Sequence, residues 1–501
     1  MSFVRALTIE RLTTVILFLL LFAMAVRVPI DTDTWWHIRS GQWIVDERAV
    51  PRSDPFSHTR VGAPWIDHSW GAQVVLYGAY WLFGGAGGVG DSGNIGLALY
   101  TAVLATAGMA LVYRMCEGTA YLRAFVVVLG AAAAAVFWSP RPQMFSFFLG
   151  ALVLYLLHRF RRERSDRLWA IPLLIALWVN LHGGYAIGFI FLIGTLIGES
   201  IAALLDPGEP DTAGWASVRR LAAVTGVSLL AVLLNPYGWH MLAYPFRTVG
   251  IGALQDFIQE WASPDFHQRQ VWPFGMLLIA VLASAGLGVR RMAWTNLVLV
   301  CGTALMALMA GRNIAVFAIV AAPVLSQNLD AWLDQRGWQL RPLRRVRGTQ
   351  LVVNWALLAV VALGAAAKIA YTLSPETMRR AQAETLPVEL AGHLRTAPPA
   401  GRMFNSYNWG GYLMFAAPDV PVYVDGRTDL YDDAFLRGYL EIVLVRDGWA
   451  EALEQQQLDV IAIEGNSVLA QMLRTRPEIW HERRFDAGRS ALFVRGDSSD
   501  E

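Results

Sequence analysis

The apolar run LTTVILFLLLFAMAV, residues 12–26, leads within a few residues into the polar sequence Asp31-Thr32-Asp33-Thr34-Trp35-Trp36-His37. With its flanks, this run has the length that a helix needs to cross the hydrocarbon core of a membrane. No small-residue cleavage site of the signal-peptide kind closes the run, so we interpret residues 12–28 as an uncleaved first span. The polar sequence then stands at a membrane surface, where two carboxylates, two tryptophans and a histidine lie close together.

The composition of the whole chain is that of a membrane protein. Of its 501 residues, 55% are hydrophobic and 16% are charged, whereas a soluble domain carries about 25% charged residues. The net charge of +1 gives no reason to expect a nucleic-acid partner. Apolar runs of spanning length recur and predict a polytopic α-helical membrane protein with about eleven transmembrane helices. The predicted spans are residues 12–28, 95–114, 121–138, 143–158, 168–181, 184–204, 216–235, 271–289, 292–311, 313–329 and 350–372.

One further apolar segment, residues 70–83, is short for a span and has the length of an interfacial piece. Arginine-rich loops normally face the cytoplasm, and this rule decides how to count the segment. If it crossed the membrane, the arginines of residues 159–167 would lie on the opposite side from Arg5 and Arg11. We therefore predict an interfacial segment, an N-terminus in the cytoplasm and a C-terminal end outside.

The sequence changes character after Ser374. Short apolar stretches then alternate with helical patterns, which is typical of a soluble α/β domain with a partly parallel sheet. No Walker loop and no Gly-x-Gly-x-x-Gly motif follows a predicted strand, so nucleotide binding is not expected. The chain thus divides into a membrane domain, residues 1–374, and an outer domain, residues 375–501. In the outer domain we expect strands at residues 402–406, 420–425, 459–463, 480–485 and 490–494, and helices at 386–394, 433–443, 448–456 and 467–475.

The order of these elements resembles the GT-C class of membrane glycosyltransferases, which includes oligosaccharyltransferases, protein mannosyltransferases and the aminoarabinose transferase of lipid A. In that class a first span leads into a large outer loop, which opens with an acidic motif and continues into an interfacial helix. Here residues 31–37 and the sequence Asp67-His68-Ser69-Trp70-Gly71 stand at those two places, within a first outer loop at residues 29–94. The class has a His-Pro-Pro-Leu element where this chain has residues 68–71. The resemblance is therefore to a divergent bacterial branch, and no sugar or acceptor is carried over from it.

The resemblance implies a reaction and a location. A sugar would move, with inversion, from a polyprenyl-phosphate carrier to a glycan, lipid or protein acceptor. The site would face the periplasm from a bacterial inner membrane. Such a transfer needs a carboxylate that takes the proton of the acceptor hydroxyl, and positive charge beside the departing phosphate.

Three acids are candidates for the catalytic carboxylate. Alternate residues of an extended segment point the same way, so Asp31 and Asp33 can act together as a base and as ligands of a divalent cation such as Mg²⁺ or Mn²⁺. The position in the family favours Asp33 as the base. Asp67 is the third candidate. Each of these residues has an alternative role as the cap of the helix that follows it.

Polar residues at the outer ends of spans are candidates for binding the substrate. An arginine between apolar spans needs an anionic partner or water, and a guanidinium binds phosphate through two parallel hydrogen bonds. Arg312 is therefore the first candidate for the lipid phosphate and Arg141 the second, with snorkelling to the headgroups as the alternative. The remaining candidates for substrate binding are His37, His68, Asn180, His182 and Asn313.

Two longer stretches are also candidates. The loop at residues 236–270 is long enough to cover the site as a lid. The sequence Asp425-Gly426-Arg427-Thr428-Asp429 follows a predicted strand, where it forms either a ligand contact or a plain turn.

Two other functions compete with sugar transfer. A transporter or lipid flippase needs polar or broken helices near the middle of the membrane, whereas the centres of these spans are nearly free of polar residues. An inactive scaffold that binds a glycan or a partner protein through the outer domain stays open.

Overall fold

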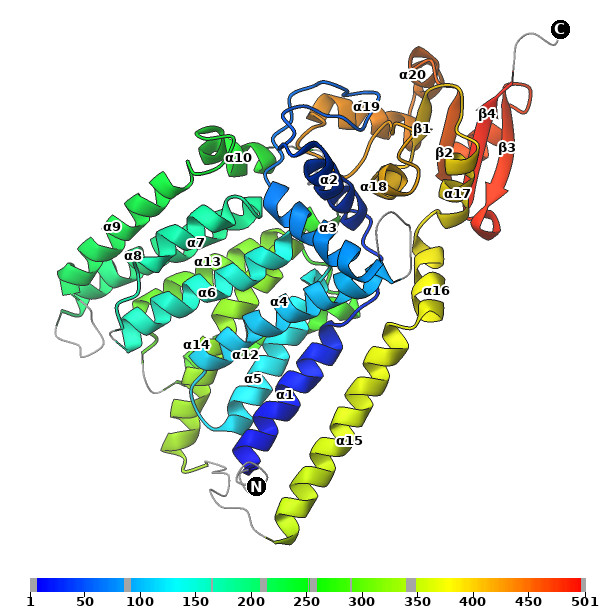
Figure 1. Ribbon diagram of the computed structural model, residues 1–501. Coiled ribbons are helices and arrows are strands. Elements are labelled where there is room, and N and C mark those ends of the chain that lie inside the picture. Colours follow the sequence, from blue (N-terminus) through cyan, green and yellow to red (C-terminus); the bar gives the residue numbers. More distant parts are fainter. Residues whose placement is uncertain are drawn as a thin grey trace.

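In the computed structural model of the protein, the described residues are 7–84, 92–163, 165–207, 214–250, 252, 259–288, 291–338 and 348–496. A bundle of long helices forms one end of the molecule, and a small domain with a sheet forms the other (Figure 1). The N-terminus lies at the end of the bundle that is far from this sheet.

The eleven predicted spans are all helical in the described part of the chain. Among the described residues, seven helices are long and apolar enough to cross a membrane, so the protein is a multi-pass membrane protein. The number eleven is not established, because α7 has 9 residues and α9 carries Arg219 and Arg220. The helices of the bundle are α1 (Ile9–Ala25), α4 (Gly93–Met115), α5 (Ala120–Ala134), α6 (Gln143–Arg162), α7 (Ala170–Trp178), α8 (Ala186–Leu205), α9 (Gly214–Ala231), α12 (Trp272–Leu287), α13 (Trp294–Met309), α14 (Ile314–Gln335) and α15 (Thr349–Thr372).

Helix α14 forms the centre of the bundle. Its residues from Ile314 to Ser326 are all buried, as expected for a helix that is apolar on every side. Helix α15 is mostly exposed and stands beside α1 at the edge (Figure 1). The ammonium group of Lys368 on α15 donates hydrogen bonds to the carbonyls of Ala23 and Val26. A cation at the C-terminal end of α1 satisfies free carbonyls and complements the helix dipole.

Two short helices, α2 (Thr34–Glu47) and α3 (Trp70–Gly84), lie between the bundle and the domain with the sheet, and a third, α10 (His240–Val249), lies above α9 on the side away from the sheet (Figure 1). Helix α3 has 15 residues and is not among the seven candidate spans, which agrees with the predicted interfacial segment. Helices α2 and α3 pack closely because Gly41 has no side chain. A Cβ at that position would overlap the carbonyl of Gln73.

The outer domain is built around a four-stranded sheet with the strand order β1-β2-β4-β3. Strand β1 (Met403–Asn405) runs parallel to β2 (Val460–Glu464), whereas β4 (Ser490–Arg495) is antiparallel to β2 and to β3 (Trp480–Phe485). The predicted partly parallel sheet is therefore present. The helices of this domain are α16 (Pro375–Thr385), α17 (Val388–Thr396), α18 (Tyr407–Ala416), α19 (Asp433–Val443), α20 (Trp449–Gln455) and α21 (Val468–Arg474).

The predicted strand at residues 420–425 is wrong. The segment is extended, but it lies outside the sheet and is held by the side chain of Asn405. This amide accepts a hydrogen bond from the N–H of Tyr423 at 2.7 Å and donates one to the carbonyl of Val424 at 2.8 Å. The segment also forms a β-bridge between Val422 and Ser57 of the first outer loop. The backbone of this segment thus pairs with a side chain and with a loop that is distant in the sequence, and not with a strand.

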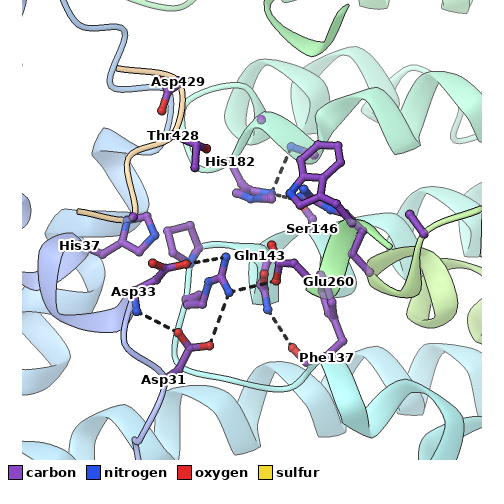
Figure 2. A pocket seen from close by; sticks show the side chains of 18 of the residues that line it. Asp31, Asp33, His37, Phe137, Gln143, Ser146, His182, Glu260, Thr428 and Asp429 are labelled. Atoms are coloured by element: carbon purple, nitrogen blue, oxygen red, sulfur yellow. Dashed lines mark hydrogen bonds and ion pairs between the residues drawn. The ribbon is translucent and has the colours of Figure 1, made fainter. Parts of the chain in front are cut away.

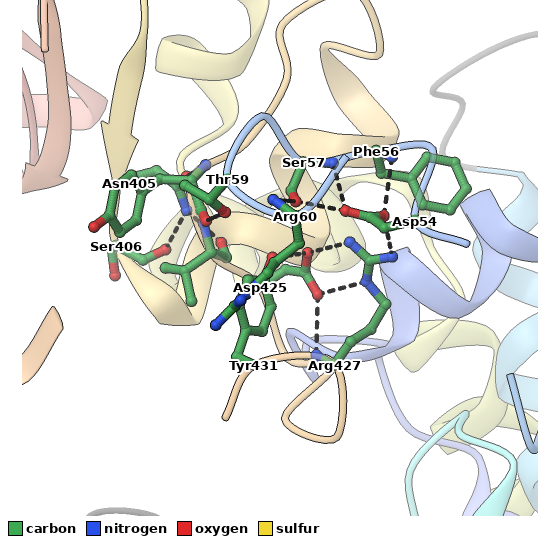
Figure 3. A network of polar contacts seen from close by, with 12 residues as sticks. Asp54, Phe56, Ser57, Thr59, Arg60, Asn405, Ser406, Asp425, Arg427 and Tyr431 are labelled. Atoms are coloured by element: carbon green, nitrogen blue, oxygen red, sulfur yellow. Dashed lines mark hydrogen bonds and ion pairs between the residues drawn. The ribbon is translucent and has the colours of Figure 1, made fainter. Parts of the chain in front are cut away.

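A buried ion-pair network joins the first outer loop to the outer domain (Figure 3). Arg427 contacts Asp54 at 2.6 Å and Asp425 at 2.7 Å, and all three side chains are 0% exposed. Tyr431 donates a further hydrogen bond, at 2.9 Å, to Asp425. The Arg427 guanidinium also lies 4.8 Å from the ring of Trp65. We call Asp54, Asp425, Arg427 and Tyr431 the interdomain latch.

We expect Arg427→Met to destabilise the protein strongly, because it leaves two carboxylates buried without their cation. Removing one partner of a buried pair costs about 3–5 kcal/mol, so the apparent Tm in detergent should fall by many degrees. The matched control is Arg380→Ala. Its partner Glu384 is 3.2 Å away, but both side chains are exposed, and such pairs contribute about 1 kcal/mol or less. Equal melting of the two variants would contradict a stabilising latch.

Candidate active site

A cavity of about 1020 Å³ lies where the bundle, the short helices and the outer domain meet. Its polar wall carries carboxylates, arginines and histidines (Figure 2). Its apolar wall is formed by side chains of the bundle helices α6, α8 and α14, namely Phe147, Ile187, Ile190, Val316 and Ile319. The cavity therefore offers a charged region beside an apolar one.

Arg141 lies at the centre of the charged region. Its guanidinium is 3.1 Å from Asp33, 3.2 Å from Glu260 and 3.5 Å from Asp31. Asp31 also accepts a hydrogen bond from the backbone N–H of Asp33 at 3.0 Å. Asp33 occupies the cap position of α2 but makes no capping hydrogen bond with its side chain. Its carboxylate is engaged with Arg141 instead.

The turn between α5 and α6 holds Arg141 in place. Pro140 and Pro142 flank the arginine and restrict the backbone. The Tyr100 hydroxyl donates to the carbonyl of Arg141 at 3.1 Å. The amide of Gln143 donates to the carbonyl of Phe137 at 2.9 Å. The position of the guanidinium is therefore set by the bundle, and not by a mobile loop.

Burial and like charges set the protonation of the cluster. Burial raises the pKa of Asp33 to about 7, and the neighbouring carboxylates of Asp31 and Glu260 add to this effect while Arg141 opposes it. Burial disfavours the Arg141 charge, but Glu260, Asp31 and Asp33 outweigh burial and raise its pKa well above the ordinary value. Arg141 thus stays charged, and Asp33 changes its protonation near neutral pH.

Two neutral histidines line the opposite part of the cavity. Burial lowers the pKa of His182 well below the ordinary value, and Nδ1 of its ring accepts a hydrogen bond from the N–H of Gly184. The Ser146 hydroxyl, 2.7 Å from the same nitrogen, must then donate to it. The other ring nitrogen of His182 therefore carries the hydrogen and remains a donor.

The second histidine, His68, belongs to a short chain of polar groups. Its Nδ1 lies 2.6 Å from the hydroxyl of Tyr244, which donates to Asp429 at 3.3 Å. Burial lowers the pKa of His68 to about 4, so this ring is also neutral at pH 7. Asp429 comes from the outer domain and Tyr244 from α10, so this wall needs three separate parts of the chain.

Arg312 differs from Arg141 in forming no ion pair among the described residues, and the charge of Glu260 acts on it only from a longer distance. Its guanidinium lies 4.1 Å from the ring of Trp261, and no carboxylate among the described residues forms an ion pair with it. Asn313, the next residue, donates to the carbonyl of Met306 at 3.1 Å and so fixes the turn between α13 and α14. The cavity wall thus contains a cation that is available to an anionic ligand.

Eight of the ten predicted site residues line this cavity: Asp31, Asp33, His37, His68, Arg141, His182, Arg312 and Asn313. The other two, Asp67 and Asn180, are not part of the described lining. Asp67 is buried and accepts a hydrogen bond from the amide of Gln73 at 2.6 Å. Asn180 accepts one from the indole of Trp70 at 3.0 Å and donates to the carbonyls of Ala176 and Leu234. Both positions fit the stabilisation of loop structure.

The interpretation of Asp425 and Arg427 as ligand contacts is wrong, because both are fully buried in the interdomain latch. Their neighbours Gly426, Thr428 and Asp429 line the cavity instead.

Several lining residues were not predicted individually. Glu260 and Tyr244 belong to the long loop at residues 236–270, for which only a general substrate contact was expected; residues 251 and 253–258 of that loop lie outside the described residues. Tyr407 and Asn408 come from the start of α18. A glutamate beside a tryptophan in an outer loop was the available signal for Glu260.

The predicted divalent cation does not fit the carboxylates as they stand. Asp31, Asp33 and Glu260 are the donor types that Mg²⁺ and Mn²⁺ prefer, but all three contact the Arg141 guanidinium. A metal ion among them would meet this fixed positive charge. In the described part of the chain, no group of three or more His, Cys, Asp or Glu side chains is arranged to hold a metal ion, and this includes Asp31, Asp33 and Glu260.

Comparison with known proteins identifies the fold. No protein-family model and no curated protein sequence matches the chain. Among solved structures, the oligosaccharyltransferase AglB from Archaeoglobus fulgidus, in complex with an inhibitory peptide and a dolichol-phosphate, matches with a TM-score of 0.58 at 11% identity. The match covers 98% of this chain and 75% of AglB.

The arabinofuranosyltransferase AftD from Mycobacteria matches with a TM-score of 0.52 at 15% identity, over 98% of this chain and 40% of AftD. The chain therefore spans about two fifths of that protein. AglB and AftD are both GT-C membrane glycosyltransferases, so the predicted GT-C fold is confirmed. At these identities the likeness establishes the fold and leaves the chemistry to the residues of the site.

We expect the carboxyl group of Asp33 to titrate near pH 7. Infrared difference spectroscopy across a pH series should show a carboxylic-acid band that disappears as the pH rises through about 7 and is missing in Asp33→Asn. Burial raises the pKa of Asp67 to about 7 as well, so the measurement is made in an Asp67→Asn background. Glu260→Gln removes a neighbouring negative charge and should lower the midpoint. An unchanged or higher midpoint in that variant would contradict the repulsion between the two acids.

Proposed function

We propose that the protein is an integral membrane glycosyltransferase that moves a sugar from a polyprenyl-phosphate carrier to a glycan, lipid or protein acceptor. The observation that carries this proposal is the cavity at the membrane end of the outer domain. It combines a carboxylate whose pKa is raised to about 7, an arginine that forms no ion pair among the described residues and an apolar wall. These three features match the acceptor hydroxyl, the phosphate and the prenyl chain of such a reaction.

The phosphate of the donor is assigned to Arg312. A guanidinium without a carboxylate partner in a partly buried wall favours a phosphate, because charge-assisted hydrogen bonds are strongest where water is excluded. The N–H of His182 and the amide of Asn313 line the same cavity and add neutral donors. The prenyl chain would lie along Ile190 and Ile319, where burial of apolar surface stabilises it.

Asp33 is assigned the role of the general base that takes the proton of the acceptor hydroxyl. A general base works best when its pKa lies near the operating pH, and the pKa of Asp33 is raised to about 7. The hydroxyl oxygen then attacks the anomeric carbon as the bond to the phosphate breaks, and Asp33 takes the hydroxyl proton. Attack from the side opposite the leaving phosphate inverts the anomeric configuration. Asp31, which accepts the N–H of Asp33, supports the position of the base.

The solved structures of similar fold support the substrate classes in this proposal. AglB was solved with an inhibitory peptide and a dolichol-phosphate, which is a lipid phosphate. The location is proposed from the arginine pattern: the bundle would cross a bacterial inner membrane with the N-terminus in the cytoplasm and the outer domain in the periplasm. The N-terminus and the outer domain lie at opposite ends of the molecule, as this orientation requires (Figure 1).

We expect Asp33→Asn to lower kcat by at least about 100-fold, because a positioned general base contributes about 10²–10⁴ in rate. The measurement is sugar transfer by purified protein from a panel of polyprenyl-phosphate sugars, with release of the lipid phosphate followed in parallel. The wild-type rate should rise with pH to a plateau, with a midpoint near 7. Wild-type turnover in the double variant Asp31→Asn/Asp33→Asn would show that the base is misassigned. Flux of the lipid-linked sugar across vesicles without a glycosidic product would favour a transporter.

Gly426 offers a second test, because it packs directly on the proposed base. A Cβ at this position would overlap an oxygen of Asp33 and come within 3.0 Å of the Trp36 indole nitrogen. The interdomain latch fixes the adjacent residues Asp425 and Arg427, so the carboxylate has to move and not the turn. We expect Gly426→Ala to lower kcat about 10- to 100-fold, since small misplacements of a catalytic group are costly.

The matched control for this variant is Gly438→Ala on α19, where a Cβ would meet no atom within 4 Å. Its kcat should stay within twofold of wild type, as replacing glycine by alanine in a helix is favourable by about 1 kcal/mol at most. If Gly426→Ala keeps the wild-type kcat and apparent Tm, contact between the outer domain and Asp33 has no catalytic importance.

A further inference from the structure

Three carboxylates converge in this site from two distant parts of the chain. Asp31 and Asp33 precede α2, and Glu260 lies about 230 residues later in a short 3-10 helix, Gln259–Trp261. Carboxylates grouped in this way repel each other and normally require a cation between them. In many proteins such a group binds Mg²⁺ or Mn²⁺ through oxygen atoms. The cation that these three carboxylates contact is the guanidinium of Arg141.

The two terminal nitrogens of the guanidinium divide the three acids between them. One terminal nitrogen, Nη1, lies 3.5 Å from Asp31 and 3.2 Å from Glu260, while Nη2 lies 3.1 Å from Asp33. The other carboxylate oxygen of Asp31 accepts a hydrogen bond from the backbone N–H of Asp33. The group therefore has its cation and much of its hydrogen bonding without a further ligand.

A divalent ion cannot simply join this arrangement. Its bonds to oxygen are about 2.1 Å long, so it would need the space between the carboxylates that the guanidinium fills. Arg141 would then have to leave, although its side chain is only 17% exposed and its backbone is held by Tyr100 and two prolines. Removing the partners of a buried charge is strongly unfavourable. The site thus accommodates Arg141 or a metal ion, but not both.

We propose that Arg141 is the resident cation of this active site and holds Asp31, Asp33 and Glu260 in the place of a divalent metal ion. This inference deepens the proposed function, on which the assignment of Asp33 as the base rests. Arg141 is then a positioning residue for Asp33, and the metal role expected for Asp31 and Asp33 is replaced by a group of the chain itself. Arg312 remains the cation for the phosphate, because it forms no ion pair in the described structure.

The test measures binding of Mn²⁺ alone to the full-length protein in nanodiscs, by loss of the electron paramagnetic resonance signal of free Mn²⁺. Wild-type protein should show no Mn²⁺ site that depends on Asp33. Arg141→Ala and the closer mimic Arg141→Gln should each create one site, at least about tenfold tighter than any wild-type binding, because three carboxylates lose their cation. Adding Asp33→Asn to either variant should abolish that site.

Two control variants make the result specific. Arg141→Lys keeps a positive charge at the position and should create no Mn²⁺ site. Arg312→Ala removes the other arginine of the cavity and should also create none, because its guanidinium does not contact the carboxylates. The apparent Tm of each variant shows that the protein is folded, and the glutamine variant replaces the alanine variant if the latter does not fold.

Two outcomes overturn the proposal. One is a wild-type Mn²⁺ site that Asp33→Asn removes. The other is the absence of any Asp33-dependent site in folded Arg141→Gln, which would show that the carboxylates do not form a donor set. Activity separates this proposal from the proposed function: sugar transfer by wild-type protein should continue in EDTA, and its loss there would overturn the role of Arg141 alone. If no lipid-linked sugar is turned over, the proposed function fails, while the Mn²⁺ measurement still decides the role of Arg141.

Discussion

The ion pair between Arg427 and the two buried aspartates is the contact on which the cavity depends. Asp54 belongs to the first outer loop and Asp425 to the outer domain, so the guanidinium binds two segments about 370 residues apart in the sequence. The net contribution of the ion pair to the free energy of folding is small, because the cost of burying the charges offsets most of their attraction. Its effect is geometric: it fixes the turn that follows Asp425, and this turn places Gly426 against Asp33 and Thr428 and Asp429 in the cavity.

The outer domain is therefore part of the site. In the described structure, some of its residues share a hydrophobic cluster with the membrane domain, in which Trp35 of α2 contacts Tyr412 of α18 at 5.2 Å between ring centres, while others form a separate cluster within the outer domain. A boundary after residue 374 divides the sequence by composition, but the packed core crosses it. Such a wall also excludes water, and in a medium of low dielectric constant the attraction between Arg141 and its carboxylates is several times stronger than in bulk water.

Local patterns explain which parts could be predicted from the sequence. Length and apolarity are properties of a single segment, so the helical runs and the short helix at residues 70–83 could be predicted from the sequence. Glu260 was not, because nothing near it in the sequence indicates that it meets Arg141 from a distant turn. The segment at residues 420–425 is rich in valine, as strands are, yet the side chain of Asn405 replaces a neighbouring strand as its hydrogen-bond partner. Asp67 and Asn180 are polar residues beside apolar segments, but Asp67 is buried and both residues form their hydrogen bonds with side chains of α3.

The two arginines of the cavity have the same charge and different surroundings, and this difference divides their roles. Arg141 meets three carboxylates, which together neutralise it and leave the group negative. An anionic phosphate would be repelled there, so Arg141 is suited to hold acids in place. Arg312 lies against an aromatic face and forms no ion pair in the described structure, with Glu260 acting on it only from a longer distance. A buried guanidinium without a direct ion pair makes an arriving anion favourable. A donor with its phosphate at Arg312 would then present its sugar toward Asp33, since both residues line one cavity. In the proposed reaction, the donor would therefore bind in one orientation, with its phosphate at Arg312 and away from Arg141 and its three carboxylates.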